Sequence, residues 1–224
     1  MCIRDSYKGV IKQNDLPTGC CNILVSPDGE RTMATHIGIG SQLHPDELSE
    51  DSLQGIDHIY MESYLWDHDL TKQTLKKVGK IAKAINIETS LSLSDPFCVD
   101  RHRDELKEFI EEYVDLVFCN FDEAKMFAQS ETMADVSSFF QSFGKKIAMT
   151  ASAEGAYYFH GETVAHQPAQ KIEQVIDTTG AGDNFAAGFL DQYLSDKTID
   201  EALARGNARA GEVIQQLGPR IKRH

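Results

Sequence analysis

A glycine-rich run that contains one acid is the part of this chain best suited to chemistry. It spans Asp177–Phe185 (DTTGAGDNF), follows the apolar pair Val175-Ile176, and leads into Phe185–Leu190, which has helical spacing. A strand, a glycine-rich turn and a helix start together bind anions, because glycine lets the backbone approach a ligand and the first N–H groups of the helix point at it. Asp183 lies within this arrangement. It can take a proton from a hydroxyl while the N–H groups hold the charge that develops.

The same run has two other interpretations. It can be a glycine-rich helix cap that binds nothing, or a dinucleotide-binding turn, since Gly180, Gly182 and Ala186 fit the spacing of some such turns. A dinucleotide turn needs a strand–helix–strand unit and an acid about 20 residues further on, at a strand end. Only a helical tail follows here. The sequence therefore favours an anion site over an NAD-dependent oxidoreductase.

The run resembles the C-terminal signature of the PfkB/ribokinase family of ATP-dependent carbohydrate and nucleoside kinases. The resemblance implies an ATP-dependent phosphotransferase that uses Mg²⁺. In it, Asp183 is the catalytic base, and the backbone N–H groups of Gly180, Ala181 and Gly182 form an anion hole. It also implies a ribokinase-like α/β fold with three layers, in which helices cover both faces of a mostly parallel central sheet.

The metal sites follow from the same resemblance. Asn120 and Glu123 look like the family's Asn-x-x-Glu motif, in which the acid acts on magnesium, often through water, and Asn120 faces phosphate or metal-bound water. One carboxylate plus ATP phosphates suits magnesium, which prefers oxygen ligands and keeps several waters. Taken alone, Asn-x-x-Glu is also a common helix start, with a cap and a first-turn acid. Many relatives bind a monovalent cation beside the anion hole, which places K⁺ near backbone carbonyls of Asp177 and Thr179.

The nucleotide contacts are expected at further strand ends. The family has a small-residue turn that contacts ATP, and the matching positions here are Thr150, Ser152, Glu154 and Gly155. Asn207 sits where family members line the adenine pocket, although helical phase alone also allows it to face solvent.

Two arginines extend the expected ATP site. Some relatives place an arginine near the phosphates after the strand at 91–93, which points to Arg101 or Arg103 here, because a guanidinium offers phosphate a planar fork of donors. A solvated helix start capped by Asp100 is the simpler interpretation of that segment.

Strands and helices must alternate to bring these residues together. The pattern of apolar residues and turn signals predicts strands at about 20–25, 30–33, 56–61, 91–93, 115–119, 146–149, 155–159 and 162–166. It predicts a helix of about 18 residues before 86, and others at about 103–112, 121–129, 133–143, 181–195 and 199–216. Such alternation gives a parallel sheet with helices on both faces, and ligands bind beyond the carboxyl ends of its strands.

Composition excludes several classes of protein. The chain has 224 residues, 41% of them hydrophobic and 25% charged, as in ordinary globular proteins. A formal charge of −13 argues against a nucleic-acid partner, and no apolar run approaches a membrane span. The five cysteines show no C-x-x-C spacing, and no secretory signal is visible. We expect a cytoplasmic monomer or homodimer whose partner is a small-molecule acceptor.

The acceptor is left open by the sequence. Residues 18–33, 60–66 and 216–220 are similar to adenosine-kinase-like members of the family, so an adenosine-like nucleoside and a sugar both remain candidates. We expect a kinase domain over 18–224, with parts of 18–35 in a lid, and a residual N-terminal segment at 1–17 whose first six residues look foreign. The family's acceptor-recognising acid and Gly-Gly hinge have no match here. An inactive or binding-only fragment is therefore the competing hypothesis.

Overall fold

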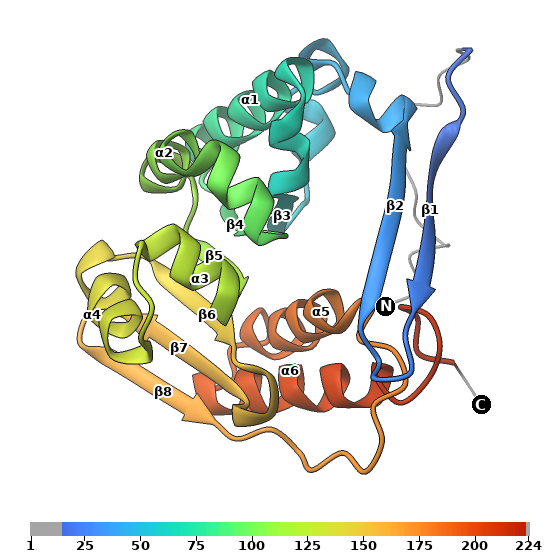
Figure 1. Cartoon of the computed structure of the whole chain (residues 1–224). Helices are drawn as coiled ribbons and strands as arrows, with labels where there is room; N and C mark the ends of the chain where they lie inside the picture. Colours follow the sequence, from blue (N-terminus) through green and yellow to red (C-terminus); the bar gives the residue numbers. More distant parts are fainter. Residues whose placement is uncertain (1–14, 223–224) are drawn as a thin grey trace.

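A six-stranded mixed sheet forms the centre of the computed structural model, which describes residues 15–222 (Figure 1). The expected foreign hexapeptide, and the part of the 1–17 segment before residue 15, lie outside the described residues. The strands lie side by side in chain order: β3 (His58–Glu62), β4 (Glu88–Ser92), β5 (Leu116–Asn120), β6 (Lys146–Thr150), β7 (Ala156–His160) and β8 (Thr163–Gln167). The strands from β3 to β6 run parallel, and β7 and β8 continue the sheet antiparallel.

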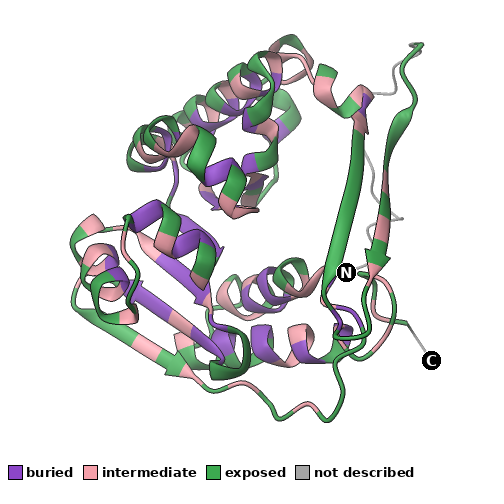
Figure 2. Cartoon of the chain, viewed as in Figure 1, coloured by how far each residue is buried: buried purple, intermediate pink, exposed green. Residues whose placement is uncertain are grey.

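Helices cover both faces of the sheet, because the inner strands are apolar on both sides. In β5, Val117 and Cys119 pack toward one set of helices, and Leu116 and Phe118 pack toward the other (Figure 2). The first set comprises α1 (Asp69–Ile85), α2 (Pro96–Tyr113), α3 (Phe121–Ala128) and α4 (Met133–Phe143); the second comprises α5 (Ala181–Tyr193) and α6 (Ile199–Val213). The three layers of the expected ribokinase-like fold are thus confirmed.

Helices α5 and α6 approach closely because glycines stand where they meet. A Cβ on Gly188 would lie 2.7 Å from the carbonyl oxygen of Arg205. A Cβ on Gly206 would lie 2.7 Å from the Phe185 ring. Real Cβ atoms do not make such contacts, so these two positions set the spacing between the helices. That spacing fixes the start of α5, where the glycine-rich run lies.

A separate two-stranded hairpin stands beside this body (Figure 1). It consists of β1 (Thr18–Val25) and β2 (Arg31–Gly38), antiparallel and mostly exposed. Its tip is held by the glycine-rich run, because Thr178 donates from its backbone N–H to the carbonyl oxygen of Gly29 at 3.3 Å and from Oγ1 at 3.2 Å. Short 3₁₀ helices at Ile39–Gln42, Pro45–Glu47 and Asp51–Leu53 lead from the hairpin to β3.

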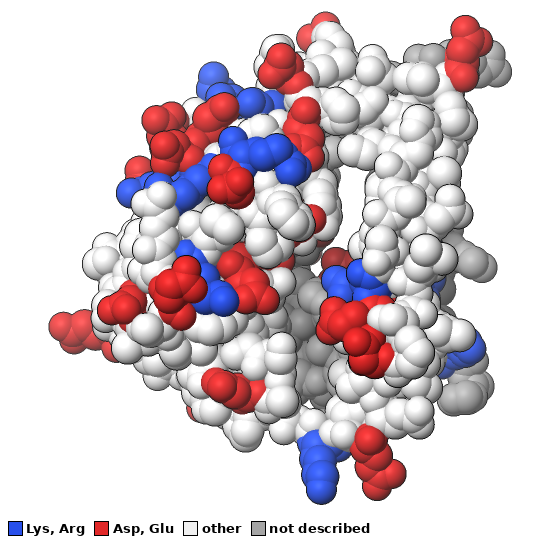
Figure 3. Space-filling model, viewed as in Figure 1, with Lys and Arg blue, Asp and Glu red and all other residues white. Residues whose placement is uncertain are grey.

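The surface charge is unevenly spread in the view of Figure 3. Acidic and basic side chains gather over α1, α2 and α3, whereas the strands of the hairpin show almost none. Across residues 15–222 there is no helix both long enough and apolar enough to span a bilayer.

The expected elements are confirmed with boundary shifts, except one strand. The expected cap at Asp100 is also wrong: α2 begins at Pro96, and Asp95 caps it by accepting from the Cys98 N–H at 3.0 Å. The sequence predicts a strand at Val175-Ile176 directly before the glycine-rich run, and this prediction is wrong. Residues 168–180 form no strand. Both side chains are exposed, and the N–H of Ile176 donates to the carbonyl oxygen of Ile214 at 2.8 Å instead of to a sheet neighbour. An exposed apolar pair buries too little surface to stabilise an additional strand of the sheet. The run is therefore positioned by its own turns and by the chain beyond α6.

We expect Gly188→Ala to destabilise the fold by about 1–3 kcal/mol, although alanine favours a helix by about 1 kcal/mol over glycine, because the added methyl forces α5 away from α6. Urea unfolding followed by circular dichroism measures the change. Ala187→Ser, on the exposed side of the same helix, is the control and should change stability little. Equal stability of Gly188→Ala and the wild type would contradict the close-packing account.

Candidate functional site

Polar side chains line the carboxyl edge of the parallel strands. The register pairs Glu62 with Ser92 at the ends of β3 and β4, and Asn120 with Thr150 at the ends of β5 and β6. Because parallel strands end at one edge of a sheet, these residues share that edge. Asn120 and Thr150 were both expected in the site, and the structure makes them neighbours.

The glycine-rich run starts α5 and leaves N–H groups free. Gly180 caps the helix at φ +77°, a conformation that suits glycine. Ala181 donates its N–H to the carbonyl oxygen of Thr178 at 3.2 Å. Among the described residues, nothing accepts a hydrogen bond from the N–H of Gly182 or of Asp183, and a Cβ on Gly182 would meet only open space. Free donors at the start of a 13-residue helix are suited to binding an anion.

The donors differ in part from those expected from the sequence. The N–H of Ala181 is used within the loop, whereas those of Gly180, Gly182 and Asp183 have no acceptor among the described residues. The carboxyl of Asp183 is exposed beside them. Its expected role as base and the anion hole itself stay predictions that this arrangement supports.

Other carboxyls lie within electrostatic reach of Asp183. Burial raises the pKa of Glu62, and the charge of Asp183 adds to that shift, while a hydrogen bond from Ser94 at 2.8 Å opposes it. Burial also raises the pKa of Tyr60, with smaller contributions from Glu62 and Asp183. Glu62 at the end of β3 therefore faces the same space as the start of α5. Burial among like charges disfavours ionisation and makes the region attractive to a cation.

Glu123 is the most buried of these acids, with 5% of its surface exposed. Burial raises its pKa to about 7, helped by the charges of Asp95 and Glu62. Its carboxylate accepts hydrogen bonds from the Asn120 backbone at 3.0 Å and from Asn120 Nδ2 at 2.7 Å. Asn120 Oδ1 in turn accepts from the Glu123 N–H at 2.8 Å. Asn120 and Glu123 thus form the capping box that a plain helix start would have. The same arrangement places the Glu123 carboxylate at the sheet edge.

Carboxylate oxygens are the donors that Mg²⁺ prefers, and this set fits a magnesium ion that is completed by phosphate and water. Within the described chain, no three acidic, histidine or cysteine side chains come close enough to hold a metal by themselves.

The expected nucleotide residues gather around one loop after β8. Gly155 has φ +101°, and a Cβ there would lie 2.1 Å from the carbonyl oxygen of Gln167. Asn207 is 9% exposed and donates from Nδ2 to the carbonyl oxygens of Gln167 at 2.9 Å and Pro168 at 3.3 Å. Ser152 and Glu154 are exposed in the turn before Gly155. Asn207 is thus buried rather than exposed to solvent. Its side chain fixes the segment at Gln167 and Pro168, against which the turn at Gly155 packs.

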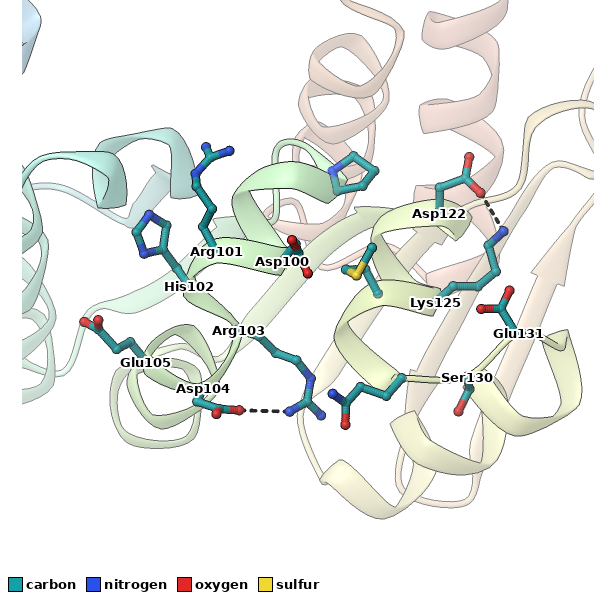
Figure 4. Close-up of a pocket in the computed structure, with 13 residues that line it drawn as sticks. Asp100, Arg101, His102, Arg103, Asp104, Glu105, Asp122, Lys125, Ser130 and Glu131 are labelled. Carbon is teal, nitrogen blue, oxygen red and sulfur yellow. Dashed lines mark hydrogen bonds and ion pairs between the residues drawn. The ribbon is translucent and has the colours of Figure 1, made fainter.

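The expected arginines lie elsewhere, along a hollow of about 600 Å³ between α2 and α3 (Figure 4). Arg101 forms a forked ion pair with Asp67 at 2.8 and 3.0 Å, and His102 contacts the same carboxylate. Arg103 donates to the Phe127 carbonyl oxygen at 2.8 Å and to Asp104. A phosphate contact by either arginine stays a prediction, and these pairings argue against it. We place the candidate site at the sheet edge, since the cations of the hollow are already paired.

Asp177 and Thr179 lie buried beneath the start of α5. Burial alone would raise the pKa of Asp177, but the Thr179 side chain, the Gly218 N–H at 2.8 Å and the Thr179 N–H at 2.9 Å outweigh it, and the pKa lies below its usual range. Thr179 Oγ1 is buried and makes no hydrogen bond of ordinary geometry, yet it lies close enough to the Asp177 carboxylate to lower that pKa. A spare buried oxygen fits the expected monovalent cation, whose binding here stays a prediction.

The sequence reasoning missed Glu62 and Arg31. Arg31 donates from its guanidinium to Thr178 Oγ1 at 2.8 Å, so the hairpin brings a positive charge to the glycine-rich run. The one sequence feature that pointed to Glu62 is its position directly after the expected strand at 56–61, as Asn120 directly follows the strand at 115–119. Nothing in the sequence signalled Arg31, because 147 residues separate it from Thr178.

Comparison with known proteins agrees with this geometry. The family described as pfkB family carbohydrate kinase matches residues 7–223. This chain belongs to that family. An adenosine kinase from Schizophyllum commune is 27% identical over 92% of this chain and 65% of its own length.

Solved structures show the same likeness. The adenosine kinase of Sinorhizobium meliloti superposes with a TM-score of 0.88 and 39% identity, over 91% of this chain and 63% of that protein. A probable sugar kinase protein from Rhizobium etli CFN 42 gives 0.89 and 36%, over 93% and 64%. The ribokinase-like fold is therefore confirmed. The chain spans a little under two thirds of the length of these relatives.

Glu123 gives the fold a specific pH dependence. A pKa raised from 4.5 to about 7 means that the folded state binds more protons than the unfolded state in this window, so stability falls as pH rises from about 4.5 to above 7. The loss approaches 3 kcal/mol. Glu123→Gln should remove this component, which urea unfolding of both proteins at pH 5 and pH 8 measures. The same pH dependence in both proteins would contradict the raised pKa.

Proposed function

We propose that this chain carries the phosphoryl-transfer site of an ATP-dependent kinase that phosphorylates a hydroxyl of a small molecule. The observation that carries the proposal is the pair of open N–H groups at Gly182 and Asp183, beside an exposed carboxyl and an open space. Phosphoryl transfer needs mainly positioned substrates and stabilised phosphate charge. The free donors of the helix start can hold the phosphoryl group and stabilise its charge, and the adjacent carboxyl can orient and deprotonate the acceptor hydroxyl.

In the proposed reaction, Asp183 accepts the proton of the acceptor hydroxyl as its oxygen attacks the γ-phosphorus of ATP. The bond between that phosphorus and the β,γ-bridging oxygen breaks, and ADP leaves. The N–H groups of Gly182 and Asp183 donate to the oxygens of the transferred group, where negative charge is concentrated in the transition state. Arg31, held on Thr178 Oγ1, adds positive charge next to these donors.

We place magnesium at Glu123, with Asn120 holding the carboxylate in position. An Mg²⁺ ion held there would neutralise phosphate charge during transfer. Binding requires the ionised carboxylate, so the raised pKa of Glu123 means that metal binding releases a proton near neutral pH. Asp95 and Glu62, whose charges raise that pKa, attract the ion to the same edge.

The nucleotide is placed along the ends of β6 and β8. Thr150 and Ser152 supply hydroxyl donors for phosphate or ribose. The turn that ends at Glu154 and Gly155 supports the loop at Gln167, which Asn207 fixes from α6. A potassium ion beside Asp177 and Thr179 would be bound by Thr179 Oγ1 or nearby carbonyl oxygens. It would offset the negative charge of the Asp177 carboxylate in the glycine-rich run.

The acceptor is proposed to be a nucleoside, with a sugar as the second candidate. Tyr64 follows β3 and is 43% exposed, with its hydroxyl donating to the Ser94 carbonyl oxygen at 3.1 Å. Phe97, at the start of α2, is 73% exposed. Exposed aromatic rings beside a polar edge suit a nucleobase, which stacks on aromatic faces. A sugar would use the carboxylate of Glu62 and leave both rings unused.

A binding-only protein and an NAD-dependent oxidoreductase are the competing classes. The first would bind ATP without consuming it, and the second would bind a dinucleotide and not ATP. The exposed carboxyl of Asp183 beside open donors favours the kinase, because a binding protein has no need of a base at that place.

The base is tested by Asp183→Asn, which keeps the shape of the side chain and removes its basicity. We expect kcat to fall by at least about 100-fold, while ATP binding measured by calorimetry stays within a few-fold of the wild type. Glu162→Gln, on an exposed side chain in the turn between β7 and β8 at the opposite edge of the sheet, is the matched control for loss of one charge. Near-normal kcat in Asp183→Asn would refute the mechanism.

The acceptor is tested by ATP consumption with adenosine, cytidine, ribose and fructose. We expect a nucleoside to be preferred, and Tyr64→Ala to raise KM for it several-fold without changing KM for any sugar that is also accepted. Tyr64→Phe keeps the ring and serves as the control. Equal effects on nucleoside and sugar would argue against stacking.

A further inference from the structure

Asn184 joins the start of α5 to the chain that follows α6. Its Nδ2 donates to the carbonyl oxygen of Gly180 at 2.8 Å and to that of Pro219 at 2.9 Å. Both amide hydrogens are therefore used. One bond closes the first turn of α5, and the other reaches residues 214–220, which we call the C-terminal strap.

The strap also contacts the glycine-rich run elsewhere. Asp177 accepts a hydrogen bond from the Gly218 N–H at 2.8 Å. Pro219 occupies the space that a side chain at Gly180 would need, since a Cβ there would lie 2.6 Å from the Pro219 Cβ. The strap thus lies directly against the residue that begins the anion site.

Hydrogen bonds to the Gly180 carbonyl oxygen restrict the orientation of the peptide unit that joins Gly180 to Ala181 at the start of α5. The C=O of Gly180 and the N–H of Ala181 form one planar unit and point in opposite directions. Glycine at φ +77° has no side chain that disfavours other orientations of this unit. Two hydrogen bonds from Asn184, through its backbone N–H at 2.9 Å and its Nδ2 at 2.8 Å, hold the carbonyl. These bonds anchor the first peptide unit of α5, and the helical turn that continues from it carries the N–H groups of Gly182 and Asp183.

We propose that Asn184 is a positioning residue for the anion site, and that through it the C-terminal strap holds the donors at Gly182 and Asp183 in place. This inference rests on the proposed function, in which those donors bind the transferred phosphoryl group. Donors aimed at developing charge lose effect when they are displaced or mobile, so the strap becomes part of the catalytic site without touching substrate.

Two substitutions separate the contacts. Asn184→Ala removes both side-chain bonds. Asn184→Ser keeps a hydroxyl that can bond to the carbonyl four residues earlier, that of Gly180, but is too short for Pro219. Gln192→Ala removes an amide from the same helix that, among residues 15–222, hydrogen-bonds through its side chain to Asp191 alone, and it serves as the matched control.

The test is a titration of the full 224-residue chain with inorganic phosphate, followed by the ¹⁵N–¹H amide signals of Gly182 and Asp183. Both signals should shift in the wild type and in Gln192→Ala with the same affinity. Asn184→Ala should bind at least fivefold more weakly, and Asn184→Ser should lie between them. A merely structural role would lower the melting temperature and leave the affinity unchanged.

The outcomes separate the two proposals. No shift at either amide in the wild type would overturn the anion site itself, and this inference with it. A wild-type shift with equal affinity in Asn184→Ala would overturn only the positioning role. Should Asn184→Ala fail to fold, wild-type affinity in Asn184→Ser would overturn the contribution of the strap, and weakened affinity would support it. In any preparation that turns over, Asn184→Ser should lower kcat and leave KM for ATP unchanged.

Discussion

The start of α5 is the point on which the other parts of the site depend, and it is held by contacts from distant segments. The tip of the hairpin binds Thr178, the chain beyond α6 binds Asp177, and α6 packs against the glycines of the helix itself. No sheet strand precedes this helix, so these contacts replace the support that a strand would give. A loop with two buried polar groups and a positive φ is stable only when its surroundings satisfy it.

Charge is distributed to match this arrangement. Acids gather at the ends of β3 and β5, where burial raises their pKa values, while the free N–H groups of α5 and the guanidinium of Arg31 lie across from them. A phosphate chain with its cation fits such a place, because the metal satisfies the acids and the donors satisfy the phosphate. The cations of the hollow between α2 and α3 differ from Arg31, because Arg101 and Lys125 are paired with carboxylates and Arg103 donates to the Phe127 carbonyl oxygen.

The sequence predicted most of the fold because its inner strands and helices carry strong apolar patterns. Asn120 and Thr150 were placed correctly at strand ends, as the register of β5 and β6 shows. The strand at Val175-Ile176 was wrong, because two apolar residues cannot show whether a partner strand exists. Arg101 and Arg103 were expected at the phosphates from the family resemblance and from the chemistry of a guanidinium. Neither indicates Asp67 or the Phe127 carbonyl oxygen, to which these side chains donate.

By itself, the sequence determined which groups this protein can offer for chemistry: a carboxyl within a glycine-rich helix start, and an acid after a strand. These are local properties, set by a few adjacent residues and their backbone preferences. Only the tertiary structure decided which donors stay free, that Glu62 and Arg31 join the site, and that Pro219 and Asn184 secure it. These depend on contacts between residues far apart in the chain, which form only when the α5–α6 layer packs on the sheet.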